Sequence, residues 1–159
     1  KAEFEASADL IECTFVGKVS EQVQKYVKAD AWLSARVHFA GYVSHAEVFG
    51  FYANADVLVL ILTDTKNAQG NIPGKLFEYL ATGIPVLALG DPKGDSATIL
   101  ADSGAGEVIA HADSEGLRKR LSHLMKAPSS ETKSADLEKY SRKNLSFQLA
   151  KILDEHTLS

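Results

Sequence analysis

Short apolar runs alternate with stretches of helical periodicity along most of the chain. Five of these runs are typical of β-strands, since each is short and bounded by glycine, proline or polar residues. The predicted strands are 10–17, 35–43, 55–62, 84–89 and 105–110, and the predicted helices are 20–33, 44–54, 74–82, 96–103 and 114–126, with one or two closing helices at 135–157. Strands that alternate with helices form right-handed βαβ units. The pattern therefore predicts an α/β fold with a mostly parallel, doubly wound sheet.

Local signals fix several of these boundaries. Ser44 and Glu47 have the spacing of a capping box, which places a helix start at Ser44. Gly83 follows the third predicted helix as a C-terminal stop. The run 55–62 is the most hydrophobic, and a strand that is apolar on both faces is predicted to be buried at the centre of a parallel sheet. Residues 127–134 are predicted to form a flexible joint.

Length, charge and cysteine content narrow the class of protein. The 159 residues are enough for a single domain, 1–159, with a sizeable core. The net charge of −4 is scattered without a basic face, so nucleic acid is not expected as a partner. Cys13, the only cysteine, lies in an apolar run, which favours a core position in a reducing, cytoplasmic compartment.

Two features of the sequence concern where the protein is located in the cell. No apolar stretch reaches the length of about 18 residues that a membrane-spanning helix needs. The chain begins at Lys1 without a methionine or a signal peptide, and we expect it to be a piece of a longer protein.

Ligands of doubly wound sheets bind beyond the carboxyl ends of the strands, which directs attention to the loops 17–20, 41–44, 63–74 and 90–95. The helix after the third of these loops carries Lys75 in its first turn and no acidic residue there. A helix N-terminus presents free N–H groups and a partial positive charge, so a lysine is unfavourable there without an anion. A phosphate bound at the start of this helix would accept hydrogen bonds from the free N–H groups and would also pair with the charge of the lysine. The alternative is an ion pair between Lys75 and Glu78, which contributes only a few tenths of a kcal/mol.

Glu78 lies about 5–6 Å along this helix from its start, because each residue rises about 1.5 Å. It shares a helical face with Lys75 and Tyr79, and the other apolar residues of the helix are predicted to pack. A carboxylate one turn beyond a bound diphosphate is placed to accept hydrogen bonds from two ribose hydroxyls, as in dinucleotide-binding folds. The alternative is an ordinary solvated glutamate.

The segment GNIPGKLFEYLATGIPVLAL (70–89) resembles the nucleotide-sugar-binding segment of the group 1 glycosyltransferases, a retaining family with the GT-B fold. Within it, PGKLFEYLATG is similar to family 4-like, bacterial polysaccharide glycosyltransferases. The stretch TFVGKV (14–19) resembles the family's second strand and glycine loop. Residues 35–62 resemble its third strand, the helix that follows and its fourth strand. Residues 140–153 resemble its C-terminal helices. The resemblance covers 11–153 and implies a Rossmann-like three-layer sandwich.

The resemblance implies the C-terminal half of a two-domain enzyme, which binds a nucleoside diphosphate sugar such as a UDP- or GDP-sugar. Glu78 falls on the family's ribose-binding glutamate. The other implied substrate-binding residues are Gly74, Lys75 and Leu76 at the diphosphate, Gly41, Tyr42 and Val43 beside the nucleobase, and Gly17 and Lys18 on the glycine loop near the phosphates.

For the complete enzyme, the resemblance implies a hexosyltransferase-type reaction that retains anomeric configuration and serves cell-surface polysaccharide synthesis. The acceptor is expected to be a saccharide or a lipid-linked molecule. No cofactor or metal is expected, and the expected partners are the sugar donor and an N-terminal acceptor domain absent from this chain. Association of the complete enzyme with the inner face of the membrane is left open.

The chain departs from the family pattern at two places. The family often has paired glutamates with seven residues between them. Glu78 would be the second of the pair, but Gly70 occupies the first position, so an acidic contact to the transferred sugar is missing or supplied elsewhere. The family's first strand and helix, with basic residues for the leaving diphosphate, should precede residue 11, but 1–9 is too short to hold them. We therefore expect a gap in the sheet and a chain that binds the donor weakly, if at all, and does not catalyse transfer alone.

Other chemistry has weaker support in the sequence. The five histidines lack the spacing of metal ligands, and no Asp-x-Asp triplet follows a strand. Lys93 and Asp95 lie in a loop at the expected ligand edge, where they would contact sugar or phosphate or form a solvated turn. Two alternatives stay open here: a non-enzymatic, receiver-like signalling module, for which only Asp64 is suitably placed, and one half of a nucleotide-sugar epimerase.

Overall fold

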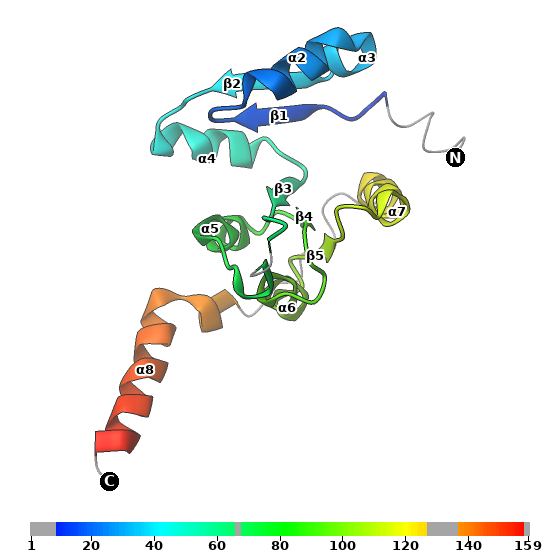
Figure 1. The fold of residues 1–159 in the computed structure, drawn as a ribbon. Coiled ribbons are helices and arrows are strands. Elements are labelled where there is room, and N and C mark those ends of the chain that lie inside the picture. The colour runs from blue at the N-terminus through cyan, green and yellow to red at the C-terminus, as the bar shows by residue number, and fades with distance from the viewer. Residues whose placement is uncertain (1–8, 66–67, 127–136, 158–159) are drawn as a thin grey trace. The chain divides into compact units, whose positions relative to one another are not determined.

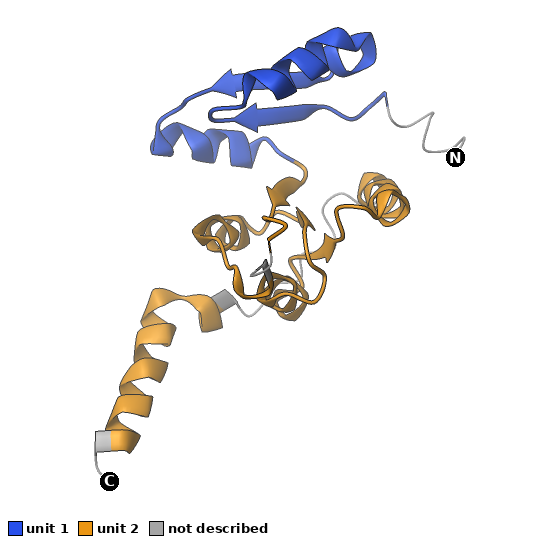
Figure 2. Ribbon diagram, in the orientation of Figure 1, with its two compact units in different colours: residues 1–55 blue, residues 56–159 orange. Residues whose placement is uncertain are grey.

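A computed structural model describes residues 9–65, 68–126 and 137–157. The chain divides into two compact units, residues 1–55 and 56–159, which are described separately below (Figure 2). The single domain 1–159 predicted from length stays a prediction. The predicted flexible joint at 127–134 lies outside the described residues.

The described residues of the first unit form two parallel strands and three helices (Figure 1). Its elements are β1 (Cys13–Val16), α2 (Glu21–Ala29), α3 (Ala31–Ser34), β2 (Val37–Gly41) and α4 (His45–Ala53). Cys13 is in register with Val37. The rings of Phe15 and Phe39, also in register, stack with centroids 5.6 Å apart.

The helix predicted at 20–33 is two helices in the structure. Asp30 has extended backbone angles (φ −108°, ψ 120°), so it ends α2 and serves as the N-cap of α3. Its carboxylate accepts a hydrogen bond of 2.9 Å from the backbone N–H of Leu33. The prediction of one helix was wrong because an aspartate side chain can bond the local backbone and start a new helix inside an apolar periodic stretch.

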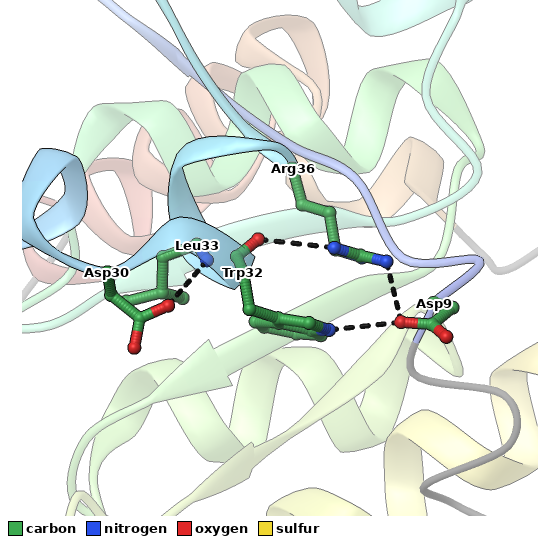
Figure 3. A network of polar contacts seen from close by, with 5 residues as sticks. All are labelled: Asp9, Asp30, Trp32, Leu33 and Arg36. Carbon is green, nitrogen blue, oxygen red and sulfur yellow. Dashed lines mark hydrogen bonds and ion pairs between the residues drawn. The ribbon is translucent and has the colours of Figure 1, made fainter.

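A polar network fastens α3 to the segment before β1 (Figure 3). Asp9 Oδ1 accepts one hydrogen bond from the Trp32 indole Nε1 at 3.0 Å and another from Arg36 Nη2 at 2.6 Å. The Arg36 guanidinium also lies over the Trp32 ring, 4.7 Å from its centroid. One carboxylate thus links two side chains that are far from it in the sequence.

The capping box predicted at Ser44 is confirmed. The Ser44 hydroxyl accepts from the backbone N–H of Glu47 at 3.3 Å, and the Glu47 carboxylate accepts from the backbone N–H of Ser44 at 2.8 Å. Asn54 ends the helix, close to the predicted position.

The second unit contains a three-stranded parallel sheet in the order β3-β4-β5. Its elements are β3 (Leu58–Ile61), the 3₁₀ turn η1 (Ala68–Gly70), α5 (Gly74–Thr82), β4 (Val86–Leu89), α6 (Asp95–Ser103), β5 (Gly106–Ile109), α7 (Ser114–Lys126), the 3₁₀ turn η2 (Leu137–Tyr140) and α8 (Arg142–Thr157). Helices α5 and α7 have the predicted bounds, and Gly83 ends α5 with the expected left-handed conformation, at φ 69°. The core includes Leu76, Val86, Leu87 and Leu100, each at most 2% exposed.

The predicted α/β class is confirmed, and every strand pair is parallel. Within the first unit β1 pairs with β2, and within the second unit the strand order is β3-β4-β5. The prediction that 55–62 forms a buried central strand was therefore wrong in part: β3 is at the edge of its sheet, with Val59 and Ile61 exposed. Leu58 and Leu60 on its other face are buried, so the hydrophobic run has one packed face.

Candidate functional site

The start of α5 has no side-chain cap. Pro73 is the N-cap and provides no side-chain hydrogen bond, and the first turn has no acidic residue. The earliest backbone bond into this helix runs from the N–H of Leu76 to the carbonyl of Pro73, at 2.9 Å. The N–H groups of Gly74 and Lys75 precede that bond and have no hydrogen-bond partner among the described residues, so they can bind an anion.

Lys75 is exposed, and within the described part of the chain no ion pair joins it to Glu78. The alternative explanation of Lys75 as the partner of Glu78 thus has no support in the structure. Glu78 is half-buried and makes an interaction of its own. Among the residues that the structure describes, no ion pair neutralises the Lys75 ammonium at this positive helix end.

The rest of α5 packs on the second unit. Leu76, Leu80 and Tyr79 are 0%, 3% and 8% exposed. Tyr79, expected on the same face as Glu78, is in the core and donates a hydrogen bond of 3.5 Å to the carbonyl of Val59. Burial raises the pKa of the Tyr79 phenol, and the nearby Glu78 carboxylate raises it further. Leu76 has a buried side chain and a backbone N–H bonded to Pro73, so its contact with a diphosphate stays a prediction.

The turn before α5 is held by two side-chain hydrogen bonds. Asn71 Nδ2 donates to the Thr63 hydroxyl, and the Ser96 hydroxyl of α6 donates to the Asn71 carbonyl, both at 2.8 Å. Ser96 is only 2% exposed. These bonds tie the entrance of α5 to the end of β3 and to the first turn of α6, so the open helix end has a fixed position within its unit.

The predicted residues of the first unit meet at one end of its sheet. Gly17 follows β1, and Gly41 is the last residue of β2. Both have left-handed φ angles, 112° at Gly17 and 72° at Gly41. The N–H of Gly17 donates to the carbonyl of Gly41 at 2.7 Å, which brings the two loops together. Lys18 is exposed, and Tyr42 is 90% exposed.

Val43 is half-buried. The structure therefore forms two groups of predicted residues, one at the loops of the first unit and one at the start of α5 in the second. The assignment of these residues to substrate binding stays a prediction.

A cleft of about 510 Å³ lies at the carboxyl ends of all three strands of the second unit. Its lining includes Asp64 after β3, Gln69 of η1, Asp91 after β4 and His111 after β5. The His111 ring Nε2 is 3.1 Å from the carbonyl of Leu62, which connects the loop after β5 with the end of β3.

Sequence reasoning singled out the loops 63–74 and 90–95 but missed Gln69, Asp91 and His111. The available signal was that a polar residue follows every strand of this unit shortly after its end. Lys93 and Asp95, which the sequence placed at this edge, are exposed and do not line the cleft. No cluster of three or more His, Cys, Asp or Glu side chains in the described residues could hold a metal ion.

A family model described as group 1 glycosyl transferases matches residues 3–127, most of the chain. The chain belongs to this family. No curated protein sequence matches it. For this group 1 glycosyltransferase chain, the match decides against the receiver-like alternative that the sequence left open.

Solved structures share the fold of this glycosyltransferase chain. HepE of Anabaena, in a crystal structure with UDP, has a TM-score of 0.62 and 17% sequence identity, and the match covers 98% of this chain and 45% of HepE. Sucrose-phosphate synthase of Thermosynechococcus elongatus has a TM-score of 0.68 and 17% identity, with 98% of this chain and 42% of that protein covered. The chain thus spans less than half the length of either protein and shares their Rossmann-like α/β fold.

Among the residues that the structure describes, no helix has both the length and the apolar character needed to cross a membrane.

Proposed function

We propose that this chain is the donor-binding half of a retaining glycosyltransferase and that it holds the diphosphate of a nucleoside diphosphate sugar at the start of α5. The observation that carries this proposal is the open helix end, with Lys75 in its first turn and no acidic residue or side-chain cap. The family match and the UDP in the HepE crystal structure support it.

Each group at this site has a chemical task. The N–H groups of Gly74 and Lys75 and the Lys75 ammonium are suited to a diphosphate, and Glu78 is suited to accept bonds from ribose hydroxyls. When the bond between the anomeric carbon and the diphosphate breaks, negative charge develops on the leaving group, and an acceptor oxygen takes its place on the sugar. Positive groups fixed at the diphosphate lower the energy of that transition state.

Gly17 and Lys18 are proposed to contact phosphates, and Gly41, Tyr42 and Val43 to border the nucleobase. The complete enzyme is proposed to act in bacterial cell-surface polysaccharide synthesis, with the acceptor bound by an N-terminal domain that this chain does not include.

Calorimetric titration of the 159-residue chain with UDP and with GDP tests the proposal. One of the two should bind, and Lys75→Ala and Glu78→Gln should each weaken its affinity by about tenfold, as expected for the loss of a charge-assisted hydrogen bond. Lys143→Ala is the matched control, because Lys143 is exposed and is likewise the second residue of its helix, α8. The proposal fails if neither nucleotide binds, or if the control weakens binding as much as the two site variants.

A further inference from the structure

The 3₁₀ turn η2 contacts both α5 and α6 within the second unit. The Tyr140 ring packs on the Phe77 ring of α5, with centroids 6.1 Å apart and planes inclined by 51°. This separation is within the range at which aromatic rings attract each other. The neighbouring Lys139 forms an ion pair of 3.6 Å with Asp102 of α6, and its ammonium also lies over the Tyr140 ring, 4.9 Å from the centroid. One short turn thus joins the C-terminal segment to two helices.

The backbone that follows η2 fixes the position of Tyr140. The N–H of Ser141 donates to the Glu138 carbonyl at 3.0 Å. The Ser141 hydroxyl accepts a hydrogen bond of 3.1 Å from the N–H of Asn144, and the Ser141 carbonyl accepts one of 2.9 Å from the N–H of Leu145. Ser141 therefore caps the start of α8 and holds that helix directly after the turn.

The contact of Tyr140 is made close to the start of α5. Phe77 is the fourth residue of this helix and shares a helical face with Gly74 and Pro73, three and four positions earlier. Helical side chains point back toward the N-terminus, so the Phe77 ring is directed toward the first turn. A Cβ at Gly74 would meet nothing within 4 Å, so the two rings do not obstruct the backbone there.

The first turn of α5 depends on contacts with other segments, because Pro73 supplies no side-chain cap. One contact is the hydrogen bond from the Ser96 hydroxyl of α6 to the Asn71 carbonyl in the preceding turn. The other is the packing of Tyr140 on Phe77. Binding groups act only where their positions are fixed to within about 0.5 Å, so both contacts bear on the groups at this helix end.

We propose that Tyr140 is a positioning residue for donor binding: its ring supports Phe77 and so fixes the first turn of α5, with Lys75 and Glu78, for the nucleoside diphosphate. The inference rests on the proposed function, because the ligand is the nucleotide assigned to α5. Tyr140 acts through Phe77 and does not itself contact the nucleotide. The ring makes the contact, so the hydroxyl of Tyr140 is dispensable for this role.

Calorimetric titration with the nucleotide that binds the unmodified chain, UDP or GDP, provides the test. Tyr140→Ala should weaken its affinity by about fivefold, as expected for the loss of an aromatic pair. Tyr140→Phe keeps the ring and should bind as tightly as the unmodified chain. Phe77→Leu removes the other ring and should weaken the affinity to the same extent. The double variant Phe77→Leu, Tyr140→Ala should bind no more weakly than either single variant, because both remove the same contact.

Phe147→Ala is the matched control, because Phe147 is an aromatic residue of the same C-terminal segment and is 69% exposed on α8. Its removal should leave the nucleotide affinity unchanged. Urea denaturation establishes that each variant is folded under the conditions of the titration, since a loss of stability alone leaves the affinity of the folded chain unchanged. If Tyr140→Ala does not fold, Tyr140→Leu, which keeps an apolar side chain, gives the same comparison.

The inference is overturned, and the proposed function stands, if the unmodified chain binds a nucleotide and Tyr140→Ala binds it equally well. It is also overturned if Tyr140→Phe binds as weakly as Tyr140→Ala, if the effects of the Phe77 and Tyr140 substitutions add in the double variant, or if Phe147→Ala weakens binding as much. Failure of the unmodified chain to bind either UDP or GDP overturns the proposed function and this inference together.

Discussion

The Ser96 hydroxyl donates a hydrogen bond of 2.8 Å to the backbone carbonyl of Asn71 and so joins α6 to the turn before α5. The two residues are 25 positions apart, and Ser96 is 2% exposed. A buried carbonyl without a partner costs free energy, so this bond holds the turn in one position. The open end of α5 therefore depends on a residue of the following helix.

Ser96→Ala should lower the free energy of unfolding by about 1 kcal/mol, because the Asn71 carbonyl loses its partner. It should also weaken nucleotide binding, because the entrance of α5 is less firmly held. Urea denaturation and calorimetry measure the two effects. Ser103→Ala is the control: Ser103 is equally buried, but its hydroxyl bonds the Leu100 carbonyl of its own helix, so nucleotide affinity should not change. Equal affinities for unmodified chain and Ser96→Ala would contradict the link to the site.

Gly83→Ala should destabilise the chain by about 1 kcal/mol. Gly83 has a φ of 69° at the end of α5, a conformation that costs other residues about 1–2 kcal/mol, although a Cβ would meet nothing within 4 Å. Gly50→Ala should have the opposite sign, with a gain of about 0.5–1 kcal/mol, since Gly50 lies inside α4 and also has space for a Cβ. Chemical denaturation of both variants measures the change in the free energy of unfolding. The prediction is refuted if the two changes have the same sign.

Cys13 should react with iodoacetamide at higher pH in the folded chain than in the unfolded chain. Burial raises the pKa of its thiol above the ordinary value of 9.0, because the thiolate is poorly solvated. The folded state thus favours the thiol, and its stability should fall as pH rises through the unfolded pKa. Mass spectrometry follows this single cysteine without interference, and Cys13→Ser provides the blank. The prediction is contradicted if the reaction of Cys13 has the same pH midpoint for the folded chain in buffer and for the unfolded chain in urea.

Glu47 should stabilise the folded chain in a pH-dependent manner. The hydrogen bonds from the Ser44 hydroxyl and from the Ser44 backbone N–H lower the pKa of the Glu47 carboxyl below its ordinary value of 4.5. Its contribution is therefore present above the unfolded pKa and is lost as pH falls through the lower folded pKa. The urea midpoint of the unmodified chain should exceed that of Glu47→Gln near neutral pH, and the difference should shrink in acid. A difference that is constant with pH would exclude the ionised carboxylate as its cause.

The sequence predicted the elements of the fold where local physics decides them. The Ser44 capping box and the glycine stop at Gly83 are written in neighbouring residues, and both appear as predicted. Asp30 shows the limit of this reasoning: its position in a helical periodicity concealed a cap that splits the stretch in two. The exposure of Val59 and Ile61 was also missed, since an apolar run does not specify how many of its faces will be covered.

The sequence by itself determined the α/β order, the family and the unusual lysine at the start of a helix, because propensity, capping and charge act between near neighbours. Only the tertiary structure decided that Tyr79 is buried, that Ser96 holds Asn71, and that Asp64, Gln69, Asp91 and His111 line one cleft. The four residues that line the cleft come from loops after three different strands. Parallel pairing brings such loops to one edge of a sheet, and the contacts made there depend on packing between segments that are distant along the chain.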